Sequence, residues 1–167
     1  MSAADLAQSI GREIPYLRRY ARALTGSQTA GDNYAAATLE AILSDRELMD
    51  AEDTRIGLFR TFHAIWQSSG QPVASENQST REAAAQAHLR GLTANSREAL
   101  LLRTIEELRY DQIARIMQID QSEAEELLEA SFAAFQRVGE MEQMESTLEA
   151  IDTQIARSIE LAATDEA

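Results

Sequence analysis

The sequence contains no cysteine and no lysine, and its 167 residues include only seven glycines and two prolines. Without cysteine there is no disulfide framework, no thiolate metal site and no cysteine nucleophile. The absence of lysine excludes Schiff-base chemistry and phosphate binding by a P-loop. Because glycine and proline are scarce while Ala, Leu, Glu and Gln are abundant, the composition predicts an all-α protein.

Long apolar runs are also absent. No stretch approaches the roughly 20 apolar residues that a membrane-spanning helix needs, and residues 1–5 lack the pattern of a signal peptide. We therefore expect a cytoplasmic protein without a membrane partner. Hydrophobic residues make up 44% of the chain, which is enough to build a buried core in one domain or two small helical ones.

The whole chain has a formal charge of −13, and its negative charge is concentrated in the second half. Residues 1–46 carry five Arg and five acidic residues, whereas residues 97–167 carry six Arg and seventeen acidic residues. Affinity for nucleic acid depends largely on cationic contacts with phosphate. We expect the second half to repel DNA.

No catalytic constellation is visible. His63 and His88 are well separated and neither has a second histidine four residues away, so each is expected to be an ordinary surface or edge histidine rather than a ligand. Glu106–Glu107 and Glu125–Glu126 are adjacent pairs whose side chains diverge on a helix, and we expect them to be solvated. The sequence predicts no enzyme, no catalytic residues, no metal site and no cofactor.

The first module is predicted over residues 1–67. Apolar residues recur at steps of three and four between Ala4 and Leu24, which predicts a helix, and Pro15 is expected to make that helix restart. Further helices are predicted over 30–43 and 54–67. The last of these carries most of the aromatic residues and should form the core of the module.

A polar linker is predicted over residues 68–80, followed by a second module over 81–138 that begins with a helical lead-in over 81–89. Residues 92–137 have the pattern of a helix-turn-helix, with a short helix over 110–117 and a third helix that begins after Asp120. A DNA-reading helix presents Arg and Lys to the groove. Here the outward positions of the third helix are acidic: Glu123, Glu125, Glu126 and Glu129.

The tail, residues 139–167, is predicted to be an amphipathic helix. Met141, Met144, Leu148, Ile151 and Ile155 recur at alternating steps of three and four, which is typical of a coiled-coil seam about two heptads long. This seam is too short to stand as a coiled coil alone, so we expect it to pack on the chain's own modules or on a partner.

Three stretches together resemble a known family. Residues 14–27 resemble the opening helix of sigma region two in extracytoplasmic-function sigma factors, residues 58–66 resemble a later helix of that region, and residues 92–137 resemble sigma region four. The likeness is greatest to the sigma-factor-like domain of PhyR-type anti-anti-sigma regulators, and it covers about residues 6–137.

Departures from a working sigma factor concern charge. Residues 67–78 contain no Arg or Lys where a sigma factor continues into a basic run, and the positions that resemble the family's basic contacts are Glu125, Leu127, Ala130 and Phe132. PhyR-type proteins also end in a receiver domain, which a helical tail without lysine cannot supply. Two alternatives follow: the chain is a fragment, with a receiver domain in a longer parent chain or in trans, or it is a stand-alone relative without control by phosphorylation.

The resemblance implies a sigma-factor mimic. Such a protein sequesters a NepR-like anti-sigma protein, which frees a general stress response sigma factor, and does not bind DNA itself. The partner is expected to lay an amphipathic helix across both modules. The partner-binding residues, chosen by predicted exposure, are Tyr20, Leu24, Tyr34, Leu39, Glu126, Leu127, Ala130 and Phe132.

Two alternatives stay open at this point. One is an atypical extracytoplasmic-function sigma factor that binds RNA polymerase and promoter DNA. The other is a helical adaptor or dimerisation module that uses the seam over residues 141–155. The sequence does not indicate an oligomeric state or a cognate sigma factor.

Overall fold

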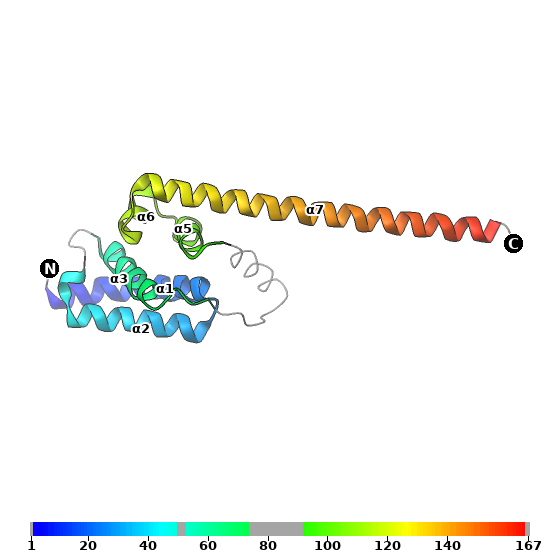
Figure 1. The fold of residues 1–167 in the computed structure, drawn as a ribbon. Helices are drawn as coiled ribbons and strands as arrows, with labels where there is room; N and C mark the ends of the chain where they lie inside the picture. Colours follow the sequence, from blue (N-terminus) through cyan, green and yellow to red (C-terminus); the bar gives the residue numbers. More distant parts are fainter. Residues whose placement is uncertain (1, 50–52, 74–91, 166–167) are drawn as a thin grey trace. The chain divides into compact units, whose positions relative to one another are not determined.

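The computed structural model describes residues 2–49, 53–73 and 92–165, and every regular element in these ranges is helical. This confirms the predicted all-α class. The lead-in over 81–89 and His88 lie outside the described residues. Residues 1–131 form one compact unit and residues 132–167 a second. The elements, labelled in Figure 1 apart from η1, are α1 (Ala3–Thr25), α2 (Gln28–Ser44), the 3₁₀ turn η1 (Arg46–Leu48), α3 (Thr54–Ser68), α5 (Ala94–Thr104), α6 (Tyr110–Met117) and α7 (Gln121–Asp165).

Helix α1 is continuous through Pro15, so the predicted restart there is wrong. Its ends are well capped: Ser2 and Asp5 form a capping box, and Gly26 closes the helix at φ 71° with its N–H donating to the Arg22 carbonyl. An internal proline costs about 3 kcal/mol in a helix. Burial of the Leu17 and Leu24 side chains on the following turns offsets that cost.

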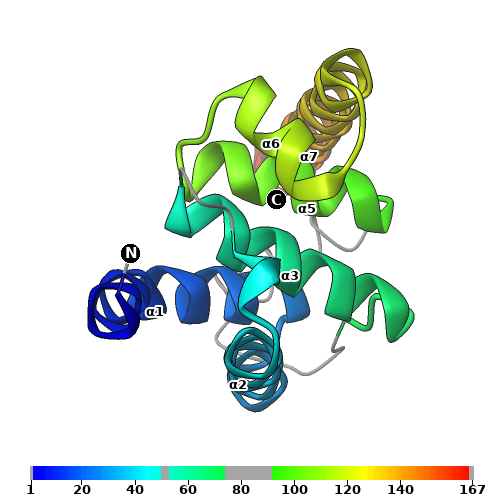
Figure 2. The ribbon, with the colours of Figure 1, turned by 90° about the vertical axis from the view of Figure 1, so that its left-hand side faces the viewer.

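Helix α2 lies beside α1 (Figures 1 and 2), and Gly31 of α2 lies close to the backbone of α1. A Cβ atom built on Gly31 would lie 2.7 Å from the backbone nitrogen of Arg22, closer than real side chains come. The next residue, Asp32, accepts hydrogen bonds of 2.9 Å from Nε and Nη2 of Arg22. The contact between α1 and α2 therefore depends on a residue without a side chain.

Helix α3 holds the aromatic core, as the sequence predicted. Phe59, Phe62 and Trp66 are fully buried, and the ring of Tyr20 on α1 lies 5.0 Å from that of Phe59 and 5.5 Å from that of Phe62. Figure 2 shows α3 between the α1–α2 pair and the helices α5 and α6. Helices α1, α2 and α6 thus pack directly on α3.

The helix-turn-helix is formed by α5, α6 and the first turns of α7. Thr93 caps α5 by accepting from the Ser96 N–H, and α6 has the predicted bounds. Gln118 takes the left-handed conformation at φ 56° and ends α6. The side chains of Ala124, Leu128 and Ser131 are buried, which packs the start of α7 into the first unit.

Helix α7 does not end at residue 138. It continues as one helix to Asp165, so no helix end marks the boundary predicted between residues 138 and 139. Within the described ranges, none of the helices is both long and apolar enough to cross a membrane.

Candidate functional site

A buried carboxylate, Glu98 of α5, joins three helices. Its Oε2 accepts a hydrogen bond of 2.9 Å from the Tyr20 hydroxyl on α1, and its Oε1 forms a hydrogen bond with Nδ1 of His63 on α3. All three residues are at most 3% exposed. Burial, and secondarily the charge of Glu98, raises the pKa of Tyr20 well above its ordinary value. Tyr20 therefore stays a hydrogen-bond donor.

His63 was expected at the surface or an edge, and that expectation is wrong. His63 is 3% exposed. The hydrogen-bond partner that makes this burial tolerable is Glu98, which lies 35 residues further along the chain. A buried polar group costs free energy unless it is hydrogen-bonded. The carboxylate of Glu98 meets this requirement for both His63 and Tyr20.

Arg97, the neighbour of Glu98, caps the end of α1. Its Nε donates to the Leu24 carbonyl at 2.7 Å and its Nη2 to the Ala23 carbonyl at 2.8 Å, with the residue 1% exposed. The last carbonyls of a helix lack partners within the helix and carry its partial negative charge. A guanidinium from α5 satisfies them here.

A second buried carboxylate, Glu106, lies in the loop between α5 and α6. Its Oε1 is 3.3 Å from Nη2 of Arg19, and its Oε2 is 4.0 Å from Nη1 of Arg55, which also bonds Glu13 at 2.8 Å. Burial raises the pKa of Glu106, and the charge of Arg19 opposes this rise. The expectation of a solvated Glu106–Glu107 pair is wrong for Glu106, which is 4% exposed, and correct for Glu107, which is exposed.

These polar residues form what we call the module interface: Tyr20, His63, Arg97, Glu98 and Glu106. It packs the helix-turn-helix of α5 and α6 on α1 and α3 through directional bonds. Buried polar groups are satisfied in few geometries, so the interface holds the sigma region two-like and region four-like parts in one arrangement. The sequence gives one signal for the module interface: the oppositely charged pair Arg97 and Glu98 stands directly before the apolar run of residues 99–102.

The first turns of α7 present what we call the acidic row: Glu123, Glu125, Glu126 and Glu129. All four are exposed, as predicted. Glu125 accepts a hydrogen bond of 3.3 Å from the Gln121 amide within the same helix. The surface that a DNA reader would offer to phosphate therefore carries four carboxylates and no cationic side chain among residues 121–130.

The predicted partner-binding residues fall into two groups. Tyr20 and Leu24 are 0% exposed, so their predicted exposure is wrong: the aromatic core of α3 and Arg97 cover them. The others are at least partly accessible, with Phe132 47% exposed and the Tyr34 hydroxyl 2.6 Å from Oγ of Ser69. They are Tyr34 and Leu39 on α2 and Glu126, Leu127, Ala130 and Phe132 on α7. Their contact with a partner stays a prediction.

In the described ranges, no group of three or more His, Asp or Glu side chains could hold a metal ion. A shallow groove on α1 is lined by Ile14, Pro15, Arg18, Arg19 and Arg22 and so combines apolar and cationic groups.

Two family models match this chain. Residues 10–63 match the Sigma2 domain of PhyR, and residues 89–137 match the model described as response regulator PhyR, sigma-like domain. The phyllosphere-induced regulator PhyR of Methylorubrum extorquens is 38% identical over 124 residues, which make up 74% of this chain and 46% of that protein. The chain thus spans about half the length of this curated relative.

Solved structures agree in fold. The NMR structure of the PhyRSL–NepR complex from Sphingomonas sp. Fr1 is similar with a TM-score of 0.69 and 40% identity, over 82% of this chain and 88% of that one. The co-crystal structure of the anti-anti-sigma factor PhyR with the anti-sigma factor NepR from Bartonella quintana has a TM-score of 0.64 and 32% identity, over 77% of this chain and 48% of that one. Both sigma-like parts are therefore matched in sequence and in structure, and the chain belongs to the family of PhyR sigma-like domains.

Proposed function

We propose that this chain is a sigma-factor mimic that binds a NepR-like anti-sigma protein and so releases a general stress response sigma factor, without binding DNA itself. The two related structures described above contain PhyR in complex with NepR. The likeness covers both the region two-like and the region four-like parts of this chain, so a partner that needs both would find both.

The observation that carries the proposal is the acidic row. Each phosphate contact that a DNA-binding protein makes releases counterions and adds to affinity, whereas four exposed carboxylates at the same place repel phosphate. The helix-turn-helix is kept and its charge is reversed. A protein partner can still recognise the shape of this surface, and its Arg and Lys side chains can pair with Glu123 and Glu126.

The module interface supports the same proposal. A partner helix that contacts both parts gains affinity when their arrangement is already formed before binding. In this proposal Tyr34, Leu39, Glu126, Leu127, Ala130 and Phe132 are the candidate contacts. Tyr20 and Leu24 are core residues that hold α1 in place.

The test is competition with a sigma factor. Purified chain is added to a preformed complex of a NepR-like anti-sigma protein and its sigma factor, and free sigma factor is measured by size-exclusion chromatography and by promoter-dependent transcription with core RNA polymerase. We expect the chain to take up the anti-sigma protein and restore transcription. Failure to displace the sigma factor would contradict the proposal.

Two controls sharpen this experiment. The chain and core polymerase alone should give no transcript, because the mimic does not act at promoters; a specific transcript would make the chain a sigma factor. Leu127→Asp should weaken binding of the anti-sigma protein, whereas Ala150→Asp adds the same charge at an exposed position of α7 outside the proposed contacts and should not.

A cytoplasmic site of action and the absence of catalysis are parts of this proposal. Exchange of one protein partner for another needs no reacting group. The sigma factor released in this proposal is the protein that acts on RNA polymerase.

A further inference from the structure

The second unit carries a row of exposed apolar side chains that nothing in the proposed function uses. We call it the apolar seam: Met141, Met144, Leu148, Ile151, Ile155 and Ile159. Each of them is between 46% and 65% exposed. Their spacing by three and four residues places them along one side of α7. Contiguous apolar surface of this kind marks a site of interaction with a partner.

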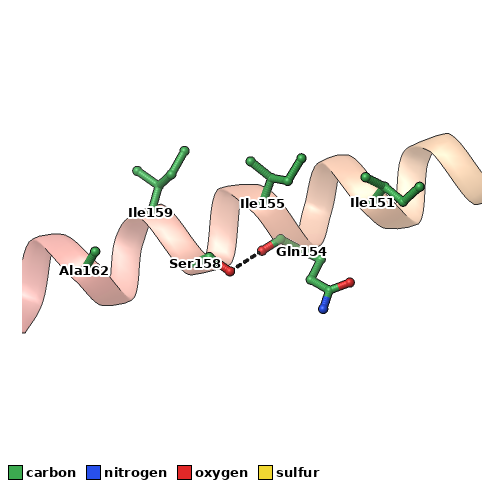
Figure 3. A pocket seen from close by; sticks show the side chains of 6 residues that line it. All are labelled: Ile151, Gln154, Ile155, Ser158, Ile159 and Ala162. Atoms are coloured by element: carbon green, nitrogen blue, oxygen red, sulfur yellow. Dashed lines mark hydrogen bonds between the residues drawn. The ribbon is translucent and has the colours of Figure 1, made fainter.

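The C-terminal part of the seam is a shallow, open surface on α7. It is lined by Ile151, Gln154, Ile155, Ser158, Ile159 and Ala162, and Figure 3 shows Ile155 and Ile159 projecting from the same side of the helix. The Ser158 hydroxyl donates to the Gln154 carbonyl at 3.0 Å. Because that hydroxyl is satisfied within α7, an apolar side chain can pack here without leaving it unbonded.

Charge around the seam selects the kind of partner. Residues 139–162 contain six acidic residues and one arginine, and Glu140 and Asp152 lie exposed beside seam positions. Residues beside the a and d positions of paired helices set partner choice through their charges. Two copies of this chain would bring like charges together, whereas a helix with flanking Lys and Arg would form opposite-charge pairs.

We propose that the apolar seam of α7 is a docking site for an amphipathic helix whose apolar face is flanked by Lys and Arg. The partner's apolar residues would insert between those of the seam, and its cationic residues would face Glu140 and Asp152. This surface comprises residues 141–159 and does not depend on the acidic row or on NepR-like binding.

The test uses two synthetic helical peptides of about four heptads, with Leu at the a and d positions. One carries Lys at e and g, and the other carries Glu. Binding to the full chain is measured by isothermal titration calorimetry at low and high NaCl. We expect the Lys peptide to bind, with an affinity about tenfold lower at high salt, and the Glu peptide not to bind. Equal affinity for both peptides, or no binding of the Lys peptide, would overturn the proposal.

Matched variants locate the site. Leu148→Asp places a charge in the seam and should reduce affinity for the Lys peptide by about tenfold or more. Ala150→Asp adds the same charge at an exposed position off the seam and should leave affinity nearly unchanged. Both variants should keep the helical circular dichroism of the parent chain, because neither position is buried.

Sedimentation of the chain alone tests the alternative that a second copy of the chain occupies the seam. If the chain dimerises and Leu148→Asp makes it monomeric, the seam is occupied by a second copy and the proposal is wrong. A monomer that binds the Lys peptide supports it. Leu148→Asp should bind a NepR-like protein as the parent chain does. Loss of that binding would place the seam within the anti-sigma site and contradict the proposal that the seam is a separate docking site.

Discussion

The Tyr20 hydroxyl donates a hydrogen bond of 2.9 Å to Oε2 of Glu98, and this bond joins the first helix to the helix-turn-helix 78 residues later. Both groups are fully buried, and the other carboxylate oxygen is bonded to His63 of α3. One carboxylate thus holds α1, α3 and α5 together. The stability of the first unit should therefore depend strongly on its partners.

Tyr20→Phe removes the hydroxyl and keeps the ring that packs on Phe59. We expect the free energy of unfolding to fall by about 1–3 kcal/mol, because a buried carboxylate loses a donor that water cannot replace. Urea denaturation measures the change. Tyr34→Phe is the matched control: its hydroxyl bonds Ser69 at an exposed position, so the loss should be well below 1 kcal/mol, within the range of about 0.5 kcal/mol for surface changes. Equal losses would contradict the role of burial.

Arg97→Met should be among the most destabilising single changes. Met retains much of the apolar stem, while the carbonyls of Ala23 and Leu24 lose the guanidinium that caps them. We expect a loss of about 2–5 kcal/mol in urea denaturation, since two buried acceptors are affected. Arg97→Lys should not restore stability, because an ammonium cannot reproduce the planar fork. Arg12→Met, at an exposed position of α1, serves as the control, and a similar loss there would argue against the capping role.

Gly31→Ala tests the close approach of α1 and α2. The added Cβ would meet backbone atoms of Ala21 and Arg22 at 2.7–2.8 Å, so the helices must separate, and we expect a loss of about 1–3 kcal/mol. Gly11→Ala is the matched change in α1, where an added Cβ meets nothing within 4 Å. It should stabilise the chain by about 0.5–1 kcal/mol through better helix propensity. Thermal denaturation distinguishes the opposite signs, and a stabilising Gly31→Ala would refute the close contact.

The pH dependence of stability should show the buried Glu106. Burial raises its folded-state pKa above the ordinary 4.5, so the folded state binds this proton more tightly than the unfolded chain. The free energy of unfolding therefore falls as pH rises from 4.5 through the folded-state pKa, and acidification towards 4.5 restores it. Glu106→Gln should lose this dependence. The measurement is urea denaturation of both chains at several pH values, and parallel curves would contradict the prediction.

Asp32 is a control for Glu106, because its effect on stability should change with pH in the opposite direction. Hydrogen bonds from Arg22 and then Arg18 lower its pKa to about 2. Its contribution to stability is present above the unfolded value of 3.8 and is lost as pH falls through 2. Asp32→Asn should therefore change the slope of stability against pH only below 3.8, outside the window of Glu106.

Local patterns in the sequence were sufficient for the helices and for the reversed charge of the helix-turn-helix. The spacing of apolar residues predicts α3 and α6 to within a residue, because each helix needs an apolar face of period 3.6. The exposure of Glu126 and its neighbours follows from the same periodicity. The resemblance of residues 92–137 to sigma region four depends only on residues that are close in the chain.

Tertiary structure alone decided which polar residues are buried and whether α1 survives its proline. Arg97, Glu98 and His63 look like surface residues in sequence, and they are buried because their partners come from helices 35 to 78 residues away. Pro15 breaks a local rule, yet packing of the next turns keeps α1 continuous. A local pattern states what each residue prefers in isolation, whereas burial is set by the residues that folding brings against it.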